Sequence, residues 1–393
     1  MKCLSSKANN FNESIIRGMT SFAVKYDAIN LGQGFPEFLP PKEILDRLEE
    51  ISHDGKFQQY PINHGSKHIR DALSKKEKYF TGVDYDPENE IIITCGGTEA
   101  MTATILALCN PGDQVAFFTP LYENYNTSCI LAGATPVYIP LLPDKNYTFD
   151  ANLLEETFKK NPNIKAMIVC NPSNPSGRVF TFEEMTIIAN LAKKYDIYII
   201  TDEVYEHIVY KPNKMTYMSN IHDMRERTII CGSLSKTYSI TGWRIGYVIA
   251  TKNIADKIKK VHNFLTISAP APLMEAATVG LNFKQDYYDN LLELYTKNRD
   301  ILIDGFDRIG IKYNKPEGTY FMLIDLKEQM EKCKEADDLK FAQLLCKEIK
   351  VCVVPCNKFF ADQNINGIFR IHFAKNKDTL YEVLNRFEKI KHL

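Results

Sequence analysis

Residues 233 to 246 read Ser-Leu-Ser-Lys-Thr-Tyr-Ser-Ile-Thr-Gly-Trp-Arg-Ile-Gly, and this stretch carries more information than any other in the chain. Two hydroxyl residues, Ser233 and Ser235, precede Lys236, and Arg244 follows it after eight positions. A lysine amine can form a Schiff base with an aldehyde, while hydroxyls and a planar guanidinium can bind a phosphate. A solvated turn is the ordinary alternative for a segment rich in Ser and Lys. The length and fixed spacing of the pattern favour a Schiff-base lysine beside a phosphate-binding site.

The same stretch matches, position by position, the lysine signature of the class I aminotransferases, which are fold type I enzymes that use pyridoxal 5′-phosphate (PLP). The chain resembles this family along nearly its whole length. The resemblance implies that Lys236 binds the PLP aldehyde covalently and later carries the substrate proton. It also implies that Ser233, Ser235 and Arg244 bind the coenzyme phosphate.

The composition is typical of a soluble globular protein: 45% of the 393 residues are hydrophobic, 25% are charged and the formal net charge is −1. This balance argues against a nucleic-acid-binding surface, which needs clustered excess cations. The N-terminus has no apolar signal-peptide core, and no apolar run reaches membrane-spanning length, so we expect no membrane partner. The ten cysteines show neither a disulfide framework nor metal-ligand spacing, which predicts a reducing cytoplasmic location and no metal site.

Short apolar runs alternate with helical patterns between residues 90 and 250, and this alternation predicts an α/β fold with a mainly parallel sheet flanked by helices. From about residue 253 onward, helices, three strands and a last helix predict a smaller α+β domain. In the resembled family the N-terminal segment packs with that domain. We therefore assign residues 46–280 to a large PLP-binding domain and residues 1–45 and 281–393 to a small domain. The seven apolar runs are 91–94, 115–118, 136–139, 166–170, 197–201, 228–231 and 245–250.

Asp202 directly follows the apolar run 197–201, and Tyr205 comes three residues later. A carboxylate at a strand end can keep a pyridine nitrogen protonated, although an aspartate in this place more often caps a following helix. The resemblance implies that Asp202 binds the nitrogen of the PLP ring and that Tyr205 binds the ring hydroxyl.

Residues 171 to 177 read Asn-Pro-Ser-Asn-Pro-Ser-Gly and follow another apolar run. Prolines exclude a helix here and glycine allows close backbone approach, although Asn-Pro pairs are also common in ordinary turns. The family carries a related Asn-Pro-x-Gly loop at this place, usually with Thr where this chain has Ser176. The resemblance implies that Asn174 contacts both the coenzyme hydroxyl and the substrate carboxylate.

Residues 95 to 100 read Cys-Gly-Gly-Thr-Glu-Ala and join an apolar run to a predicted helix. The free N–H groups at the start of a helix attract phosphate, although a tight strand–helix turn without a ligand has the same appearance. The resemblance implies backbone contacts to the phosphate from Gly97, Thr98 and Glu99.

Two tyrosines complete the predicted coenzyme site. Tyr122 takes the place of the aromatic residue that stacks on the pyridine ring in the family, although an ordinary core position would also suit it. Tyr60 matches a tyrosine that in the family reaches the phosphate of the neighbouring subunit, which implies a two-fold homodimer with active sites at the interface. A local turn is the alternative for Tyr60.

Two residues are predicted to bind the substrate. Arg370 lies inside the apolar run 368–373, where a charge is costly unless a carboxylate pairs with it. An internal carboxylate is the common partner, but the resemblance implies that Arg370 binds the α-carboxylate of the substrate. Gly34 lies in a segment that resembles the substrate lid of the family.

We expect the enzyme to transfer the amino group of an L-amino acid to a 2-oxo acid by a ping-pong mechanism. Residues 32 to 37, Gly-Gln-Gly-Phe-Pro-Glu, resemble the kynurenine/glutamine and methionine aminotransferases, except that Glu37 replaces Asp. This favours methionine, glutamine or aromatic donors. A β-lyase of cysteine conjugates or cystathionine, an aspartate-type aminotransferase and a non-catalytic PLP-fold regulator are the alternatives.

Overall fold

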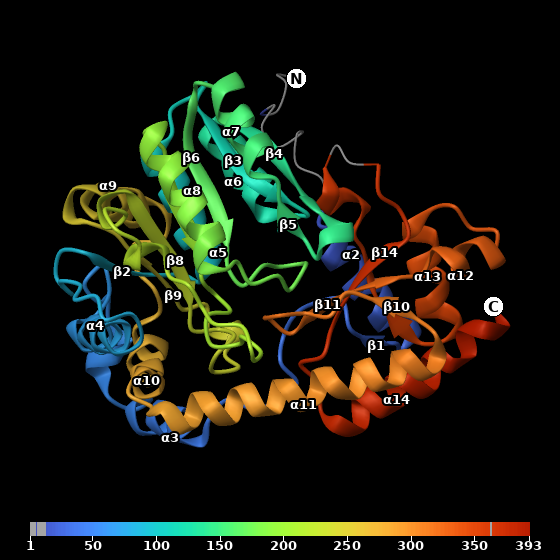
Figure 1. The fold of residues 1–393 in the computed structure, drawn as a ribbon. Coiled ribbons are helices and arrows are strands. Elements are labelled where there is room, and N and C mark those ends of the chain that lie inside the picture. Colours follow the sequence, from blue (N-terminus) through green and yellow to red (C-terminus); the bar gives the residue numbers. More distant parts are fainter. Residues whose placement is uncertain (1–4, 6–12, 362–363) are drawn as a thin grey trace, which may run out of the picture.

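The computed structural model describes residue 5 and residues 13–361 and 364–393. An eight-stranded sheet and a four-stranded sheet lie on opposite sides of the molecule, and the long helix α11 (Gln285–Ile309) runs beneath both (Figure 1). In order across the large sheet, the strands are β2 (Ile91–Thr94), β9 (Gly246–Ile249), β8 (Thr228–Ser233), β7 (Tyr198–Asp202), β6 (Ile164–Cys170), β3 (Gln114–Thr119), β4 (Thr135–Leu142) and β5 (Thr148–Phe149).

The large sheet confirms the predicted α/β architecture, because each of the seven apolar runs overlaps one of its strands. The pairs β7–β8, β6–β7, β3–β6 and β3–β4 are parallel. Strand β9 is antiparallel to both of its neighbours, β2 and β8, and β5 is antiparallel to β4. The ends of β2 and β8 therefore point to the same edge of the sheet as the ends of the parallel strands.

Helices cover both faces of the large sheet, because alternate residues of its strands point to opposite sides. Ile168 and Ile200 pack against α5, α6 and α9, whereas Met167 and Ile199 pack on the opposite face against α7 and α8. The helices of this part are α3 (Lys42–Ile51), α4 (Lys67–Thr81), α5 (Gly97–Leu108), α6 (Asn124–Ala132), α7 (Ala151–Lys160), α8 (Phe182–Lys194), α9 (Lys252–Leu265) and α10 (Ala271–Leu281).

Helix α8 illustrates how local sequence sets the element boundaries. The side chain of Thr181 accepts a hydrogen bond from the backbone of Glu184, and the side chain of Glu184 accepts one from the backbone of Thr181. This capping box satisfies two donors that would otherwise be free at the helix start. Lys193 and Lys194 in the last turn complement the helix dipole and favour the end of the helix at Lys194.

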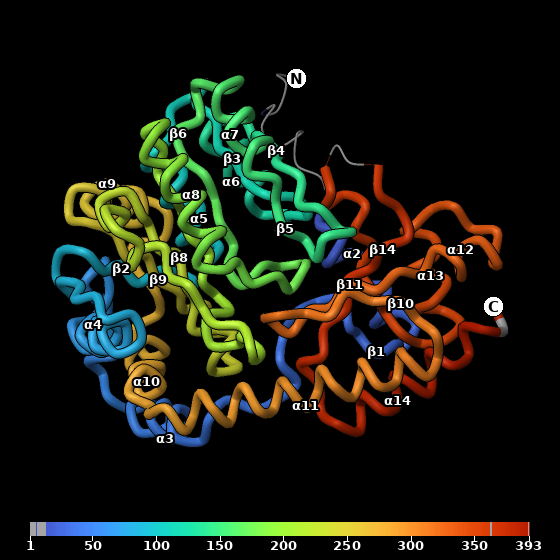
Figure 2. The backbone as a smooth tube through the Cα atoms, viewed as in Figure 1, coloured from blue at the N-terminus to red at the C-terminus, as the bar shows by residue number. Residues whose placement is uncertain are grey.

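The second sheet has the order β10 (Lys312–Tyr313), β11 (Phe321–Asp325), β14 (Ile368–His372) and β13 (Val354–Pro355), and all its pairs are antiparallel. The N-terminal strand β1 (Ile29–Asn30) pairs in parallel with β12 (Val351–Cys352), which joins the two ends of the chain (Figure 2). The remaining helices are α2 (Ile15–Tyr26), α12 (Lys327–Lys332), α13 (Asp338–Glu348) and α14 (Lys377–Phe387).

The described helices and cysteines bear on the expectations for membrane spans and disulfides. Among the residues that the structure describes, no helix combines the length and the apolar character needed to cross a membrane. The nine cysteines of the described segments are all free thiols.

Candidate active site

The loops at one edge of the large sheet bring the predicted residues together. Gly246 at the start of β9 pairs with Thr94 at the end of β2 and with Ser233 at the end of β8. In the same edge region, Asp202 ends β7 opposite Cys170 at the end of β6. Loops beyond the carboxyl ends of strands form the usual ligand site of an α/β sheet. The loops that follow these strand ends carry Gly97, Asn174, Asp202 and Lys236.

The amine of Lys236 points toward the N-terminal segment. Its Nζ donates a hydrogen bond of 2.7 Å to the carbonyl oxygen of Gly34 and lies 5.9 Å from the ring centre of Tyr320. Burial, followed by the positive charges of Arg370 and Arg244, lowers the pKa of Lys236 to about 7. Because neighbouring cations and burial both disfavour the ammonium form, a substantial fraction of this amine is neutral near pH 7.

Gly34 is required by the close packing around that contact. A Cβ atom at Gly34 would lie 2.4 Å from Cζ of Phe321, which is closer than any real contact. The hydroxyl of Tyr320 donates to the same Gly34 carbonyl at 3.0 Å. Sequence reasoning did not identify Tyr320, and its position directly before an apolar strand gave no sign of a site residue.

Asp202 is half-buried and accepts two hydrogen bonds. The hydroxyl of Tyr125 donates to Oδ2 at 2.6 Å and the backbone N–H of Val204 donates to Oδ1 at 3.3 Å. Burial raises the pKa of Asp202, and both hydrogen bonds oppose that rise. A turn rather than a helix follows β7, so the alternative that Asp202 caps a helix is wrong. Sequence reasoning did not identify Tyr125, which lies three residues after Tyr122 in the first turn of α6.

Tyr205 is buried next to the aromatic residues that surround Gly34. Its ring centre lies 5.3 Å from that of Tyr320 and 5.8 Å from that of Phe321, and both pairs meet edge to face. Burial raises the pKa of Tyr205 well above its usual value, so its hydroxyl remains protonated. The hydroxyl can therefore donate a hydrogen bond.

Arg370 is 2% exposed and is held by neutral groups. Its Nη1 donates to Oδ1 of Asn174 and its Nη2 donates to the carbonyl oxygen of Gly32, each at 2.8 Å. The guanidinium stacks on Phe321 at 4.2 Å, and its Nε has no hydrogen-bond partner among the described residues. No carboxylate of the described segments forms an ion pair with it, so the internal partner considered from the sequence is not found there. The neutral neighbours leave the charge of this buried guanidinium without a counterion, so an anion would stabilise it.

The N-terminus of α5 and the residues before β9 approach each other closely. A Cβ atom on Gly96 would lie 2.3 Å from Nη2 of Arg244, and a Cβ atom on Gly246 would lie 2.4 Å from the backbone of Gly96. Arg244 itself has a φ of 57°, and its Nη1 donates to the carbonyl oxygen of Thr241 at 2.9 Å. The glycines thus allow the guanidinium to lie against the first turn of the helix.

Two serines lie at the same place. Ser233 Oγ accepts a hydrogen bond of 3.1 Å from the backbone N–H of Ser235. The hydroxyl of Ser235 is buried and has no partner among the described residues. Ser233 packs against Gly97 and the Arg244 guanidinium lies against Gly96, so these groups, the free hydroxyl of Ser235 and the N–H groups of Gly97 and Thr98 suit the phosphate of PLP. We call this arrangement, made by Gly97, Thr98, Ser233, Ser235 and Arg244, the phosphate cradle.

The side chain of Glu99 is already bound elsewhere. Its Oε1 accepts hydrogen bonds of 2.7 Å from His262 and 2.8 Å from Thr266, and its Oε2 accepts the backbone N–H of Cys95. Only the backbone N–H of Glu99 therefore remains for the phosphate contact that the sequence predicted.

The two predicted tyrosines differ in placement. Tyr122 is half-buried, its hydroxyl accepts a hydrogen bond of 3.0 Å from Asn124, and its ring meets that of Tyr125 edge to face. Tyr60 is 83% exposed, so the structure does not bring it into the site of its own chain.

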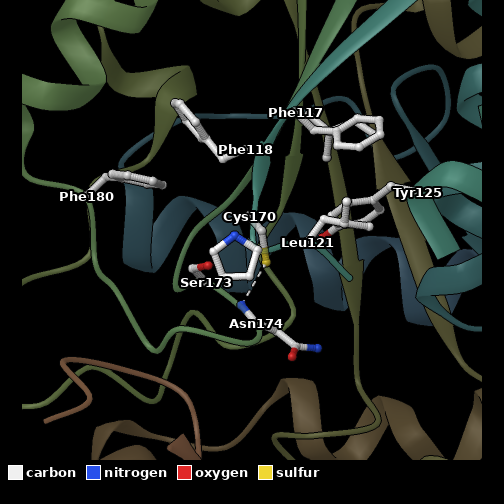
Figure 3. Close-up of a pocket in the computed structure, with 10 residues that line it drawn as sticks. Phe117, Phe118, Leu121, Tyr125, Cys170, Ser173, Asn174 and Phe180 are labelled. Atoms are coloured by element: carbon white, nitrogen blue, oxygen red, sulfur yellow. Dashed lines mark hydrogen bonds between the residues drawn. The ribbon is translucent and has the colours of Figure 1, made fainter. Parts of the chain in front are cut away.

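A small cavity adjoins Asn174 between the ends of β3 and β6 (Figure 3). The backbone N–H of Asn174 donates to Sγ of Cys170 at 3.4 Å, which fixes the loop to the strand end (Figure 3). Gly177 closes this loop with a φ of 69°, and a Cβ atom there would lie 2.6 Å from Pro316. The cavity is lined by Phe117, Phe118, Pro120, Leu121, Tyr125, Ile168, Cys170, Ser173, Asn174 and Phe180.

Comparison with known proteins agrees with this geometry. Residues 26–387 match the family described as aminotransferase class I and II. The chain belongs to the class I and II aminotransferases. It is 31% identical to a probable N-succinyldiaminopimelate aminotransferase of Mycobacterium tuberculosis, with 97% of each chain covered. It is also 31% identical to the methionine aminotransferase of Escherichia coli, with 98% of each chain covered.

Solved structures give the same result for the fold of this aminotransferase. The structure of the M. tuberculosis N-succinyldiaminopimelate aminotransferase superposes with a TM-score of 0.93, at 31% identity, over 99% of this chain and 100% of the other. The E. coli methionine aminotransferase superposes with a TM-score of 0.92, at 30% identity, over the same shares. The chain is therefore a fold type I transaminase that depends on PLP.

Proposed function

We propose that this aminotransferase binds the α-carboxylate of its amino acid substrate at Arg370. The observation that supports the proposal is a buried guanidinium that has only neutral partners among the described residues. A substrate carboxylate would supply the missing negative charge, and the planar fork of arginine matches its two oxygens. Asn174, which already contacts Nη1 at 2.8 Å, would orient the guanidinium and bind the same carboxylate.

Lys236 acts in this proposal as the base and then the acid of the reaction. PLP, when bound, withdraws electrons from the substrate and so stabilises negative charge at its α-carbon. The amine of Lys236 would take the α-proton of the substrate and then release it to the coenzyme carbon on the other side of the amino nitrogen. A pKa of about 7 suits both roles, because a group whose pKa is close to the working pH can accept and release a proton.

The other predicted contacts follow from the groups that are free in the site. The carboxylate of Asp202 would pair with a protonated ring nitrogen, and the hydroxyl of Tyr205 would bind the ring hydroxyl. The ring of Tyr122 would stack on the pyridine ring, and the phosphate cradle would hold the phosphate. In the family, hydrolysis and a second half-reaction with a 2-oxo acid give ping-pong kinetics.

We also propose that methionine, glutamine or aromatic amino acids are the preferred donors. Phe35 and Phe38 follow Gly34 in the lid segment, and an aromatic-rich lid would favour apolar side chains over a second carboxylate. One relative is named a methionine aminotransferase, and a human relative at 31% identity is named kynurenine–oxoglutarate transaminase 3. That relative covers 92% of this chain and 84% of its own length.

A homodimer in the cytoplasm, with domains divided near residues 45 and 280, completes the proposal. Tyr60, Ile62 and Phe264 are 83%, 56% and 89% exposed, and Asn63 and Asn263 hold their two segments together at 3.4 Å. Such an apolar surface is typical of an interface. A second subunit would cover it and receive Tyr60 at its phosphate cradle.

The test is to titrate the purified protein with single amino acids and to follow the coenzyme absorbance. We expect conversion with methionine, glutamine and aromatic donors, and loss of the visible coenzyme band and of turnover in Lys236→Ala. Strict preference for aspartate would contradict the donor assignment, an active Lys236→Ala variant would contradict the role of the lysine, and release of pyruvate and thiol without an oxo acid would indicate a β-lyase.

A further inference from the structure

His262 is a completely buried histidine that joins three parts of the chain outside the substrate site. It lies in the last turn of α9 and is 0% exposed. Its Nδ1 is 2.7 Å from Oε1 of Glu99, which belongs to the first turn of α5. Its Nε2 is 2.8 Å from the backbone carbonyl oxygen of Asn63.

These two contacts determine the protonation state of the ring. The Asn63 carbonyl can only accept, so Nε2 must carry a proton. The carboxylate of Glu99 already accepts hydrogen bonds from Thr266 and the backbone of Cys95, so it is an acceptor toward Nδ1 as well. Beside an ionised Glu99 both ring nitrogens donate, which makes His262 an imidazolium, and the hydroxyl of Thr266 lies 3.3 Å from the same Nδ1. Burial opposes this charge, but the hydrogen bond and the negative charge of Glu99 raise the pKa of His262.

The electrostatic setting agrees with an ion pair at this place. Glu99 lies at the N-terminus of α5 and His262 at the C-terminus of α9, where the two helix dipoles favour a negative and a positive charge, respectively. The pair is withdrawn from solvent, so salt screens it weakly.

The imidazolium connects two elements that matter for coenzyme binding. Glu99 directly follows Thr98 of the phosphate cradle. Asn63 lies three residues after Tyr60, whose side chain is 83% exposed. The segment that carries Tyr60 is thus bonded to the helix that starts at the cradle of the same subunit.

We propose that His262 is a positioning residue of the coenzyme site, which holds the Tyr60 segment against α5 so that Tyr60 can complete the phosphate site of a second copy of this chain. The inference rests on the proposed dimer and extends it. In each subunit, the charged pair of His262 and Glu99 would link the phosphate cradle to the segment whose Tyr60 completes the site of the other subunit. The link acts through position, since His262 does not touch the cradle itself.

Other ionisable groups lie near this pair. Cys95 precedes α5, and burial raises the pKa of its thiol, which stays neutral. His64 follows Asn63, and burial lowers its pKa, so it titrates at lower pH than His262. Lys259 lies one turn earlier on α9, and its Nζ donates a hydrogen bond to the backbone carbonyl oxygen of Glu88.

The experiment measures the dissociation constant of PLP for the apoenzyme in a double-mutant cycle of His262→Gln and Tyr60→Phe. Gln keeps the size and a donor but removes the charge, so we expect about tenfold weaker PLP binding. In the Tyr60→Phe background the same change should have no further effect, because its route to the phosphate is gone. His222→Gln, which alters an exposed histidine paired with Asp223, is the matched control and should bind PLP like the wild type.

The dependence on pH gives a second readout. As the pH rises through the raised pKa of His262, the wild type loses its charge, and the tenfold gap to His262→Gln should close. If His262→Gln does not fold, Glu99→Gln takes its place in the same cycle with the same expectation. Unchanged PLP affinity, or independent effects of the two changes, would overturn the role of His262 while leaving the transaminase intact. A wild type that binds no PLP would instead overturn the proposed function on which the role rests.

Discussion

The hydroxyl of Tyr125 donates a hydrogen bond of 2.6 Å to the carboxylate of Asp202. The contact gives this half-buried carboxylate a hydrogen-bond donor, and it lowers the pKa of Asp202, which burial raises. The ionised form of Asp202, at the end of strand β7, therefore depends on a residue of helix α6.

Tyr125→Phe should raise the pKa of Asp202, because the ionised carboxylate loses its strongest donor while its burial is unchanged. We expect kcat/KM near neutral pH to fall about tenfold. The acid limb of the pH–rate profile should move to higher pH, since the carboxylate is then protonated earlier as the pH falls. An unchanged acid limb would show that Asp202 does not control this ionisation.

Arg370 is tested by two substitutions that separate its shape from its charge. Arg370→Lys keeps a cation but loses the planar fork, and Arg370→Gln loses both, so kcat/KM for the amino acid should fall about 100-fold or more in each. Only Arg370→Gln should raise the pKa of Lys236, because Arg370 is one of the cations that lower it. The rate of PLP binding to the apoenzyme, measured against pH, should then shift its midpoint upward in that variant alone. Equal midpoints in both variants would contradict the electrostatic coupling.

Gly34 and Gly18 form a matched pair for the packing argument. Gly34→Ala would place a Cβ atom 2.4 Å from Phe321 and displace the carbonyl that accepts from Lys236, so we expect strong loss of activity and a lower melting temperature. Gly18 lies within α2 and has no atom within 4 Å of its Cβ position, so Gly18→Ala should raise the free energy of unfolding by about 0.5–1 kcal/mol. An active, stable Gly34→Ala enzyme would show that the lid segment can move aside.

Lys76 tests a buried charge cluster behind the sheet. Its Nζ lies 2.7 Å from Glu206 and 3.0 Å from Glu77, and all three side chains are buried. Lys76→Met leaves buried carboxylates unpaired and should lower the free energy of unfolding by about 3–5 kcal/mol. Lys78→Met, which breaks an exposed pair with Asp84, should cost about 1 kcal/mol or less.

The pH dependence of that loss follows from Glu206. Burial raises its pKa, but the charge of Lys76 outweighs burial and holds the pKa at about 2. The ionised carboxylate therefore stabilises the wild type above the ordinary carboxyl pKa, and this contribution disappears as the pH falls toward 2. The deficit of Lys76→Met, measured by urea unfolding, should be largest near neutral pH and smaller at pH 4. A deficit that is independent of pH would point to lost packing instead.

Local sequence predicted the elements of this aminotransferase because its signals are short-ranged. The seven apolar runs each overlap a strand of the large sheet, and the Thr181–Glu184 capping box marks the start of α8. The sequence alone did not show that β9 runs antiparallel to both neighbours, because strand direction depends on how the chain returns through space.

The motif residues could be named from the chain because their types and spacing reflect the chemistry that they serve. Several partners of those residues could not, since they come from far along the chain: Tyr125 lies 77 residues from Asp202, and Gly32 lies 338 residues from Arg370. These partners are a core tyrosine that donates and a backbone carbonyl that accepts, and neither has a distinctive sequence signal.

By itself, the sequence determined the covalent chemistry: an amine at position 236, a carboxylate at 202 and guanidiniums at 244 and 370. Only the tertiary structure decided how those groups ionise, because a pKa depends on burial and on charges that approach through space. The near-neutral pKa of Lys236 and the protonated state of His262 both arise from neighbours brought together by folding, so they belong to the packed molecule and not to any segment of it.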